Sequence, residues 1–254
     1  MARVVALANQ KGGVGKTTTA VNLGAYLAHA GKRVLLLDMD PQANATSSLG
    51  VDKNTLARSV YDVLIGAEPA SRLVCLTACT GLDLLPASPA LAGAQIELVP
   101  MAGRETKLRR ALEPLRPRYD YVLIDTPPSL GMLTVNALTA ADGVLIPIQC
   151  EYLPLEGLGQ LLHTIELVRQ SLNPDLAISG LVLTMYDPRT NLSRQVVEEI
   201  RQHFPVIVFR SIIPRSIKLS EAPSYGEPII TYAPHSSGGQ AYESLCREVL
   251  DRER

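Results

Sequence analysis

A glycine-rich turn with two lysines follows the first apolar run of the chain, and this pattern is typical of a phosphate-binding loop. The run Val4 to Ala8 is followed by the segment Lys11-Gly-Gly-Val-Gly-Lys-Thr-Thr18. Glycines allow positive φ and a close approach of the backbone, so that successive N–H groups can surround a phosphate chain. In such a loop Lys16 reaches the β- and γ-phosphates and the Thr17 hydroxyl binds Mg²⁺. The predicted nucleotide-binding residues are Lys11, Gly12, Gly13, Val14, Gly15, Lys16, Thr17 and Thr18.

The start of this loop departs from the usual pattern. G-x-x-x-x-G-K-[ST] would place a glycine at position 10, where this chain has Gln10, followed by the second lysine, Lys11. Because Gly12, Gly13 and Gly15 lack a Cβ, the turn can take positive φ and approach the phosphate oxygens closely. An ordinary turn between a strand and a helix is the alternative interpretation. Three glycines, two lysines and two threonines at this spacing favour a nucleoside triphosphate as the ligand.

A carboxylate ends a later apolar run, at the place where P-loop ATPases hold the Mg²⁺ shell. Asp125 directly follows the run Tyr121 to Ile124, and the second acidic residue of such sites ends a strand in this way. A carboxylate that only caps a turn is the alternative. Its combination with a phosphate loop favours the metal-binding interpretation.

Two more carboxylates, Asp38 and Asp40, come directly after the run Arg33 to Leu37. They lie at i and i+2, so both would face one side if the strand continued. Ligands of open α/β folds bind beyond the carboxyl ends of the strands. We therefore predict that Asp40 orients the attacking water, while Asp38 supports either the metal shell or the loop; a plain turn before Pro41 is the alternative. The candidate residues at the Mg²⁺ are Thr17, Asp40 and Asp125.

Strands and helices alternate along the chain, which predicts an α/β fold with a mainly parallel twisted sheet and helices on both faces. Short connections predict one domain over residues 1–254. The expected strands after the first are Arg33–Leu37, Leu82–Leu85, Tyr121–Ile124, Val144–Ile148, Ile178–Met185 and Val206–Ile213. The expected helices are Lys16–Ala30, Ser59–Ile65, an exposed one over Glu105–Leu115, and those over Leu155–Leu172, Leu192–His203 and Gln240–Asp251.

Composition narrows the class of protein. Apolar residues make up 46% and charged residues 19%, which is typical of a globular chain. With two Phe and no Trp the core must be aliphatic, and a net charge of −1 gives no overall signature of nucleic-acid binding. Four scattered cysteines do not predict a metal site. No targeting peptide and no membrane-spanning run are recognisable, which predicts a cytoplasmic protein.

Motifs along the whole chain resemble the deviant Walker A ATPases of the ParA/MinD class, and those of the chromosomal Soj type in particular. The phosphate loop with Lys11 is one of them, and Asp38-Met-Asp-Pro-Gln-Ala-Asn-Ala-Thr-Ser47 resembles the switch I segment of ParA proteins. The other matches are Tyr121-Val-Leu-Ile-Asp125-Thr-Pro-Pro, Pro147-Ile-Gln-Cys-Glu-Tyr152, Thr184-Met-Tyr-Asp-Pro-Arg189-Thr-Asn and Ile213-Pro-Arg-Ser-Ile-Lys218-Leu-Ser-Glu-Ala-Pro.

The resemblance implies a role for each matching residue. Lys11 crosses a dimer interface to the partner's nucleotide, and Asp40 is needed for hydrolysis. Adenine lies against the loops around Met185 and Pro214, although Met185-Tyr186 replaces the base-reading pair of some relatives. The cofactors implied are ATP and Mg²⁺.

DNA binding is implied at Arg189 and Lys218. Arg194, Arg201, Arg210 and Arg215 are candidates to extend this surface. The segment from Arg104 to Arg118 is the rival: six basic and two acidic residues give it a net charge of +4. Runs of this kind are more often a solvated helix face.

The family resemblance implies a nucleoid-associated ATPase that forms an ATP-dependent homodimer. It binds double-stranded DNA non-specifically and segregates a chromosome or plasmid with a ParB/Spo0J-type partner. A MinD-like membrane-associated division-site ATPase is the alternative, but residues 247–254 lack the apolar stripe that membrane anchoring needs. A reductase like the nitrogenase iron protein is a second alternative, and the cysteines are not placed for its cluster.

Overall fold

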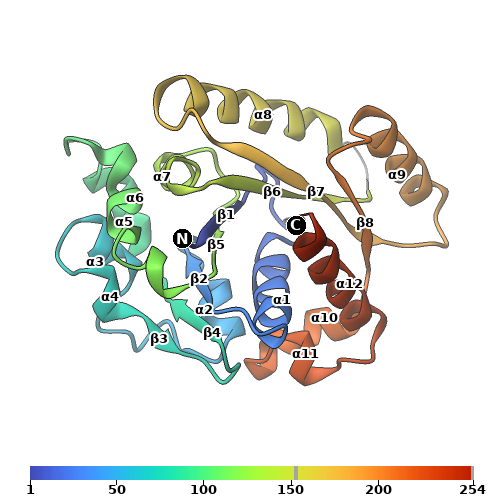
Figure 1. The fold of residues 1–254 in the computed structure, drawn as a ribbon, viewed down its shortest axis with the longest axis horizontal. Coiled ribbons are helices and arrows are strands. Elements are labelled where there is room, and N and C mark those ends of the chain that lie inside the picture. The colour runs from blue at the N-terminus through green and yellow to red at the C-terminus, as the bar shows by residue number, and fades with distance from the viewer. Residues whose placement is uncertain (152–153, 253–254) are drawn as a thin grey trace.

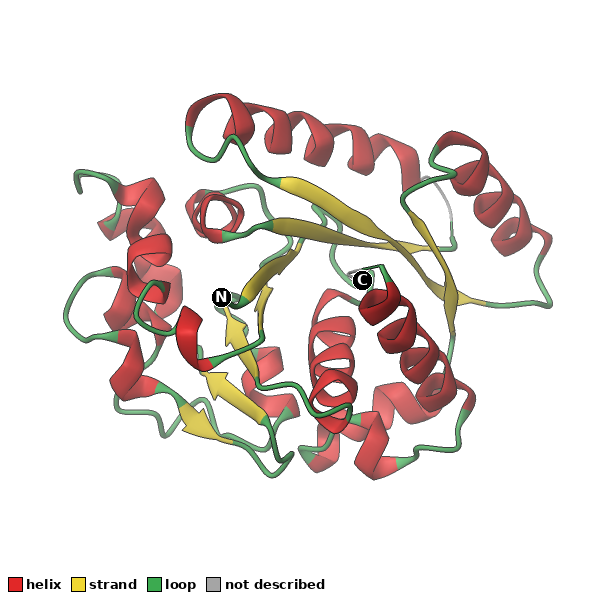
Figure 2. Cartoon of the chain, in the orientation of Figure 1, coloured by secondary structure: helices red, strands yellow, loops and turns green. Residues whose placement is uncertain are grey.

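The apolar runs of the sequence form the strands of one mainly parallel sheet (Figures 1 and 2). The computed structural model describes residues 1–151 and 154–252, and within them the strand order is β3-β4-β2-β5-β1-β6-β7-β8. Only β3 and β4 pair in antiparallel orientation, so the predicted α/β class is confirmed. The strands are β1 (Arg3–Leu7), β2 (Val34–Asp38), β3 (Cys75–Leu76), β4 (Leu82–Leu85), β5 (Tyr121–Asp125), β6 (Gly143–Gln149), β7 (Ala177–Tyr186) and β8 (Val208–Pro214).

Helices cover both faces of the sheet, as expected; Figure 1 shows α1 and α12 on one side and α7 and α8 on the other. Tyr152 of the Pro147 motif and the last two residues, 253–254, lie outside the described residues. The α-helices are α1 (Lys16–His29), α2 (Asn44–Ser48), α3 (Val60–Leu64), α4 (Ala70–Leu73), α5 (Leu91–Glu97), α6 (Lys107–Leu112), α7 (Met132–Ala140), α8 (Pro154–Ser171), α9 (Asn191–His203), α10 (Ile217–Glu221), α11 (Ile229–Tyr232) and α12 (Ser237–Asp251). Short 3₁₀ helices span Arg104–Thr106, Arg116–Arg118 and Ala222–Tyr225.

The central strands are apolar along most of their length, with charged residues only at their ends, because both of their faces are buried. On β2, Leu35 and Leu37 lie in the core cluster that α7 and α8 complete. Leu36 lies in the opposite cluster, together with residues of α1 and α12. Parallel strands covered by helices on both sides read as continuous apolar runs rather than alternating ones. Successive side chains therefore alternate between two aliphatic cores.

The sheet brings the phosphate loop and the acidic residues to one edge. β5 lies between β1 and β2, with Asp125 in register with Leu7 on one side and with Asp38 on the other. All three strands run in the same direction, so their carboxyl ends open onto the same space. The loop that leaves β1 begins there, as ligand loops of open α/β sheets do.

The helix expected over residues 105–115 is shorter and less exposed than predicted. A 3₁₀ turn precedes α6, which ends at Leu112, and its residues Leu108 and Leu112 are fully buried. The basic residues therefore lie on one face of a helix whose other face is core. Helix α7 was not predicted at all.

Side chains of α12 complete the hydrogen bonding along the outer side of the edge strand β8. The Glu248 carboxylate accepts from the backbone N–H groups of Arg210 and Ser211, at 2.8 and 3.0 Å. Arg252 donates to the carbonyl oxygen of Val208 at 2.8 Å and stacks over the Phe209 ring. Burial opposes ionisation of Glu248, but these N–H donors outweigh it and keep the pKa of its carboxyl below the usual value.

Candidate functional site

The phosphate loop connects β1 to α1 in a conformation that depends on two glycines. Gly13 and Gly15 have φ of 74° and 87°, and Gly15 is the residue that precedes the first turn of α1. A side chain is strained at such angles. Gly12 does not use this freedom: its φ is not positive, and a Cβ there would lie 3.8 Å from Pro128, an ordinary contact. The loop is therefore shaped by its third and fifth residues.

Two polar side chains that the sequence analysis missed hold this loop in place. Asn9 donates to the carbonyl of Pro147 at 2.7 Å and accepts from the Lys11 N–H at 3.0 Å. The Thr184 hydroxyl at the end of β7 donates to the carbonyl of Val14 at 2.8 Å. Both side chains are buried. Their nearness to strand ends is the only sequence signal that could have identified them.

Lys16 is buried beneath the loop and faces the acidic residues. It is only 6% exposed, and its Nζ donates to the carbonyl of Lys11 at 3.2 Å. Burial lowers the pKa of its ammonium group, although Asp125 and Asp40 act in the opposite direction. A cation withdrawn from water and held beside a ring of N–H groups can neutralise a bound phosphate.

Thr17 and Asp125 form a polar pair that fits a divalent cation. The Thr17 hydroxyl donates to Asp125 Oδ2 at 2.7 Å, and Asp125 is fully buried. Its second oxygen, Oδ1, is buried without a hydrogen-bond partner. Burial first, and the nearby Asp38 second, raise the pKa of this carboxyl well above its usual value. An unpaired buried acceptor beside a hydroxyl is the donor set that Mg²⁺ takes, either directly or through its bound water.

Asp38 and Asp40 take different positions, because β2 ends at Asp38 and Asp40 lies in the following turn. The strand does not continue past Asp38, so the condition under which both carboxylates would face one side is not met. Both oxygens of Asp38 accept hydrogen bonds within the loop, from the Asp40 N–H at 3.1 Å and from Thr46 at 2.7 and 2.8 Å. Of the two roles left open for Asp38, its contacts match support of the loop. Asp40, 7% exposed, accepts from the Gln42 N–H at 2.9 Å, which is the turn geometry given as the alternative.

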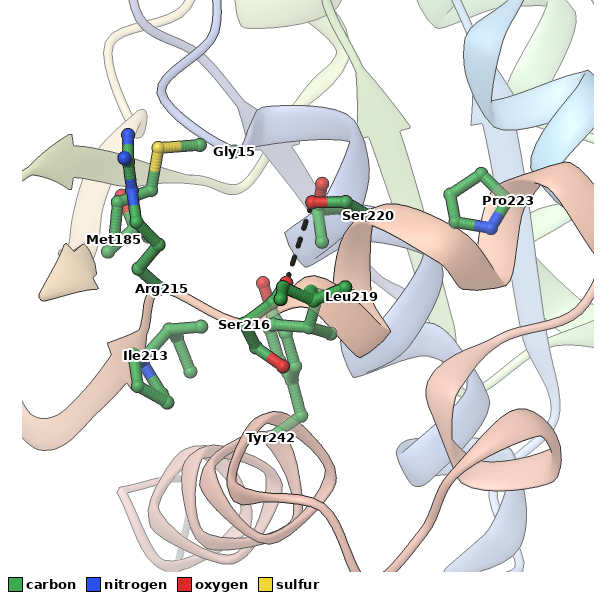
Figure 3. Close-up of a pocket in the computed structure, with 13 residues that line it drawn as sticks. Gly15, Met185, Ile213, Arg215, Ser216, Leu219, Ser220, Pro223 and Tyr242 are labelled. Carbon is green, nitrogen blue, oxygen red and sulfur yellow. Dashed lines mark hydrogen bonds between the residues drawn. The ribbon is translucent and has the colours of Figure 1, made fainter.

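A cleft of about 430 Å³ opens beside the phosphate loop, where the sequence placed the adenine (Figure 3). Met185, the last residue but one of β7, has φ of 53°, an uncommon left-handed conformation for a residue with a side chain. Figure 3 shows Met185 close to Arg215, and Tyr242 on the far side of the opening. The lining residues include Gly15, Thr18, Met185, Pro214, Ser216 and Tyr242. The structure thus brings Met185 and Pro214 together with the loop.

The two residues predicted to contact DNA are exposed, and each has a carboxylate partner. Arg189 forms a two-pronged ion pair with Asp187, with N–O distances of 2.8 and 2.9 Å. Its side chain is 85% exposed. Lys218, on α10, lies 2.9 Å from Glu221 and 5.5 Å from the centre of the Tyr232 ring. Both cations are accessible to a partner only in exchange for these contacts.

The rival basic segment is largely occupied by contacts within the chain. Arg104 pairs with Glu105 at 2.9 Å. Arg116 pairs with Asp142 at 2.6 Å, and Arg109 donates to the carbonyl of Leu172 at 3.1 Å. These contacts attach α6 and the turns around it to the body of the molecule. The segment therefore offers less free charge than its sequence suggests.

Among the described residues, no helix combines the length and the apolar character that crossing a bilayer needs.

Comparison with known proteins identifies the family. A family model described as an AAA domain matches residues 2–178. The sporulation initiation inhibitor protein Soj of Bacillus subtilis (strain 168) is 55% identical over 249 residues, covering 98% of this chain and 98% of that protein. The chromosome partitioning protein ParA of Myxococcus xanthus (strain DK1622) is 53% identical over 251 residues, covering 99% of this chain and 89% of the relative.

Solved structures share the fold over the whole chain. One described as cobyrinic acid a,c-diamide synthase from Mycobacterium smegmatis, with bound ADP and magnesium, is 43% identical with a TM-score of 0.88. It covers 100% of this chain, which covers 96% of that one. The cell division ATPase MinD of Pyrococcus furiosus is 25% identical with a TM-score of 0.81, and the coverage is 99% of this chain and 100% of the other.

A glycine loop between β1 and α1, a buried lysine beneath it and a strand-end carboxylate opposite define a P-loop ATPase. The chain belongs to the ParA/Soj family of chromosome-partitioning ATPases. The resemblance seen in the sequence motifs is thereby confirmed.

Proposed function

We propose that residues 1–254 form a single Mg-ATP-dependent ATPase domain that dimerises on ATP, binds DNA without sequence preference and segregates a chromosome or plasmid with a ParB-type partner. The main support for this proposal is the cluster of Lys16, Thr17 and Asp125 beneath the loop, in a chain 55% identical to Soj. ADP and magnesium in a 43% identical structure support the choice of ligand. The proposed location is the cytoplasm, on the nucleoid.

In this proposal, different residues of the site bind Mg²⁺, bind the phosphate chain and orient the attacking water. Thr17 and Asp125 would hold Mg²⁺, with Asp40 beside it, and the bound ion neutralises charge on the phosphate oxygens. The N–H groups of the loop and Lys16 bind and orient the phosphate chain. Asp40 orients the attacking water from the turn after β2. The proposed turnover is weak without the partner protein.

Dimerisation is proposed to occur through the face that carries the loop. Lys11 is exposed, whereas Lys16 is buried. A lysine at the outer end of the loop can reach a nucleotide in a second copy of the chain, and the buried lysine serves the nucleotide of its own protomer.

The C-terminal helix supports this proposal over the MinD-like alternative. On α12, Tyr242, Leu245 and Cys246 are buried in the core cluster shared with α1. A helix that lies on a membrane needs a free apolar face, and this face of α12 is already covered. Sedimentation with anionic liposomes tests the alternative directly: co-sedimentation that depends on ATP would favour it.

DNA binding tests the proposed function, and it should require ATP and weaken steeply with salt. Arg189→Glu or Lys218→Glu places an anion where a phosphate should lie, in both subunits of a dimer. Each lost phosphate contact flattens the slope of log affinity against log salt by about one unit, so each variant should lose about two. The measurement is gel or filter binding of random-sequence duplex with ATP, with ADP and without nucleotide.

The possible outcomes distinguish a wrongly assigned DNA-binding surface from a wrong proposed function. Variants that keep the wild-type affinity and salt slope would move the DNA-binding face to the segment from Arg104 to Arg118. Binding without nucleotide would contradict the ATP-dependent dimer. Sequence-selective binding, or none by the wild type, would contradict the segregation function itself.

Because the Asp187 carboxylate competes with phosphate for Arg189, we expect a variant without this charge to bind DNA more tightly. Asp187→Asn keeps an oxygen for the Arg189 N–H, which lies 3.0 Å from it, but removes the charge that competes with phosphate. Exposed ion pairs are weak, so affinity should rise about twofold to tenfold in a symmetric dimer. The matched control is Asp175→Asn, an exposed aspartate before the other end of β7 that makes the same change in net charge. Equal gains in both variants would show a general charge effect only.

A further inference from the structure

A buried hydrogen-bond network surrounds the turn that carries Asp40, and its centre is Thr46, a residue of the switch I-like segment to which the sequence motifs assign no role. Thr46 is fully buried on α2. Its backbone N–H and its hydroxyl both donate to Asp38 Oδ2, at 2.8 and 2.7 Å. Asp38 Oδ1 accepts from the Asp40 N–H at 3.1 Å. One carboxylate therefore binds the turn on both sides of Asp40.

The Thr46 hydroxyl also connects this turn to the neighbouring strand. While it donates to Asp38, it accepts from the N–H of Ala87 at 2.9 Å. Ala87 is buried just after β4, the strand that pairs with β2. A hydroxyl can donate one hydrogen bond and accept others, and this one does both. It thus fixes the turn relative to the sheet as well as within itself.

The turn is held against its own conformational preference. Ala43, between Asp40 and Thr46, has φ of 50° and is fully buried. Its N–H donates to the carbonyl of Asp40 at 2.8 Å. A left-handed residue with a side chain persists where the surrounding contacts determine its conformation. At the solvent side, Lys53 Nζ adds a hydrogen bond of 2.6 Å to the carbonyl of Gln42.

We propose that Thr46 is a positioning residue for ATP hydrolysis, which acts by fixing the turn through Asp38 and Ala87 so that the Asp40 carboxylate faces the attacking water. The proposal rests on the role of Asp40 proposed above. Small displacements of a group that orients a reactant lower the rate of the chemical step more than they weaken binding. Among the described residues, the Thr46 hydroxyl hydrogen-bonds to Asp38 and Ala87, and Thr46 does not line the nucleotide cleft, so its effect should appear in kcat.

Removal of the hydroxyl while the shape of the side chain is kept tests the proposal. Thr46→Val leaves Ala87 N–H without its acceptor and Asp38 without one donor. We expect kcat for ATP to fall about 10- to 100-fold, the range for a lost hydrogen bond to a charged group, with KM within about twofold. Thr46→Ser retains the hydroxyl and should restore kcat to within about threefold of wild type. Thermal melting of both variants reports on folding.

If Thr46→Val does not fold, a variant at the surface of the same turn still tests the proposal. Lys53→Met removes the bond to Gln42 from the exposed side of the same turn, and kcat should fall about twofold to fivefold with unchanged melting. Lys107→Met, on α6, is the matched control and should keep the wild-type kcat.

Three results would overturn the proposal. They are a wild-type kcat in a folded Thr46→Val, an equal loss in Thr46→Ser, and a rise in KM that accounts for the loss. If Thr46→Val does not fold, an unchanged kcat in Lys53→Met overturns it. Asp40→Ala, measured in parallel, separates the two claims: full activity of that variant contradicts the role of Asp40, whereas its inactivity beside an active Thr46→Val contradicts only the role of Thr46.

Discussion

Replacement of Asp40 by alanine is expected to stop hydrolysis while ATP stays bound. The substitution removes the carboxylate that we propose orients water but leaves Lys16, Thr17 and Asp125 with the contacts they have now. Positioned general bases contribute about 100-fold or more to a rate, so kcat should fall by at least that factor. The nucleotide trapped in the site should keep the protein in its dimeric form. Steady-state ATPase assays and size exclusion with ATP measure the two effects.

The control for this variant is Asp52→Ala. Asp52 is exposed beyond α2, and its carboxylate accepts only from the neighbouring Asn54 among the hydrogen bonds seen in the described residues. It should hydrolyse ATP at the wild-type rate. A wild-type rate in Asp40→Ala as well would show that another residue orients the water.

Substitutions of Lys16 and Lys11 are expected to impair different properties, nucleotide affinity in the first case and dimerisation in the second. Lys16→Gln removes the buried charge beneath the loop, so nucleotide affinity itself should drop by about 10- to 100-fold, the range for a charge-assisted hydrogen bond. Lys11→Ala changes an exposed side chain, so affinity of the monomer should stay within about twofold. This variant should instead lose ATP-dependent dimerisation. Calorimetric titration gives the affinities, and light scattering gives the mass with ATP.

Lys32→Ala, at the turn between α1 and β2, is the control for both lysine variants and should dimerise normally. An equal loss of nucleotide affinity in Lys11→Ala and Lys16→Gln would contradict the contact across the interface. Normal dimerisation of Lys11→Ala would contradict it as well.

The strands were predictable because burial on both faces leaves a continuous apolar run. Leu82–Leu85 was predicted with its observed bounds, and the beginning of α1 followed from the glycine that precedes it. Helix α7 was missed for the same physical reason: Met132–Ala140 is apolar almost all round, so it lacks the polar face that reveals a helix. The short helices after Pro214 give too few turns for periodicity to appear.

The site residues were predictable where a local sequence motif is typical of one chemical role. Lys16, Thr17 and Asp125 lie where the pattern implies, because a phosphate loop and a strand-end carboxylate depend on local sequence. The arrangement of Asp38 and Asp40 was not predictable, since it depends on where β2 ends and on Thr46, eight residues further along. No local pattern marks a threonine that bridges a carboxylate and the backbone of another strand.

The contacts between α12 and β8 determine whether this edge of the sheet can pair with a strand from another molecule. An edge strand with free N–H and C=O groups is a template for a strand of another molecule. On β8, Glu248 and Arg252 already bind the N–H groups of Arg210 and Ser211 and the carbonyl of Val208. At the opposite edge, β3 has only two residues and offers little to pair with. These features disfavour pairing of strands between copies of the chain, which agrees with the proposal that the dimer forms through the surface that carries the nucleotide.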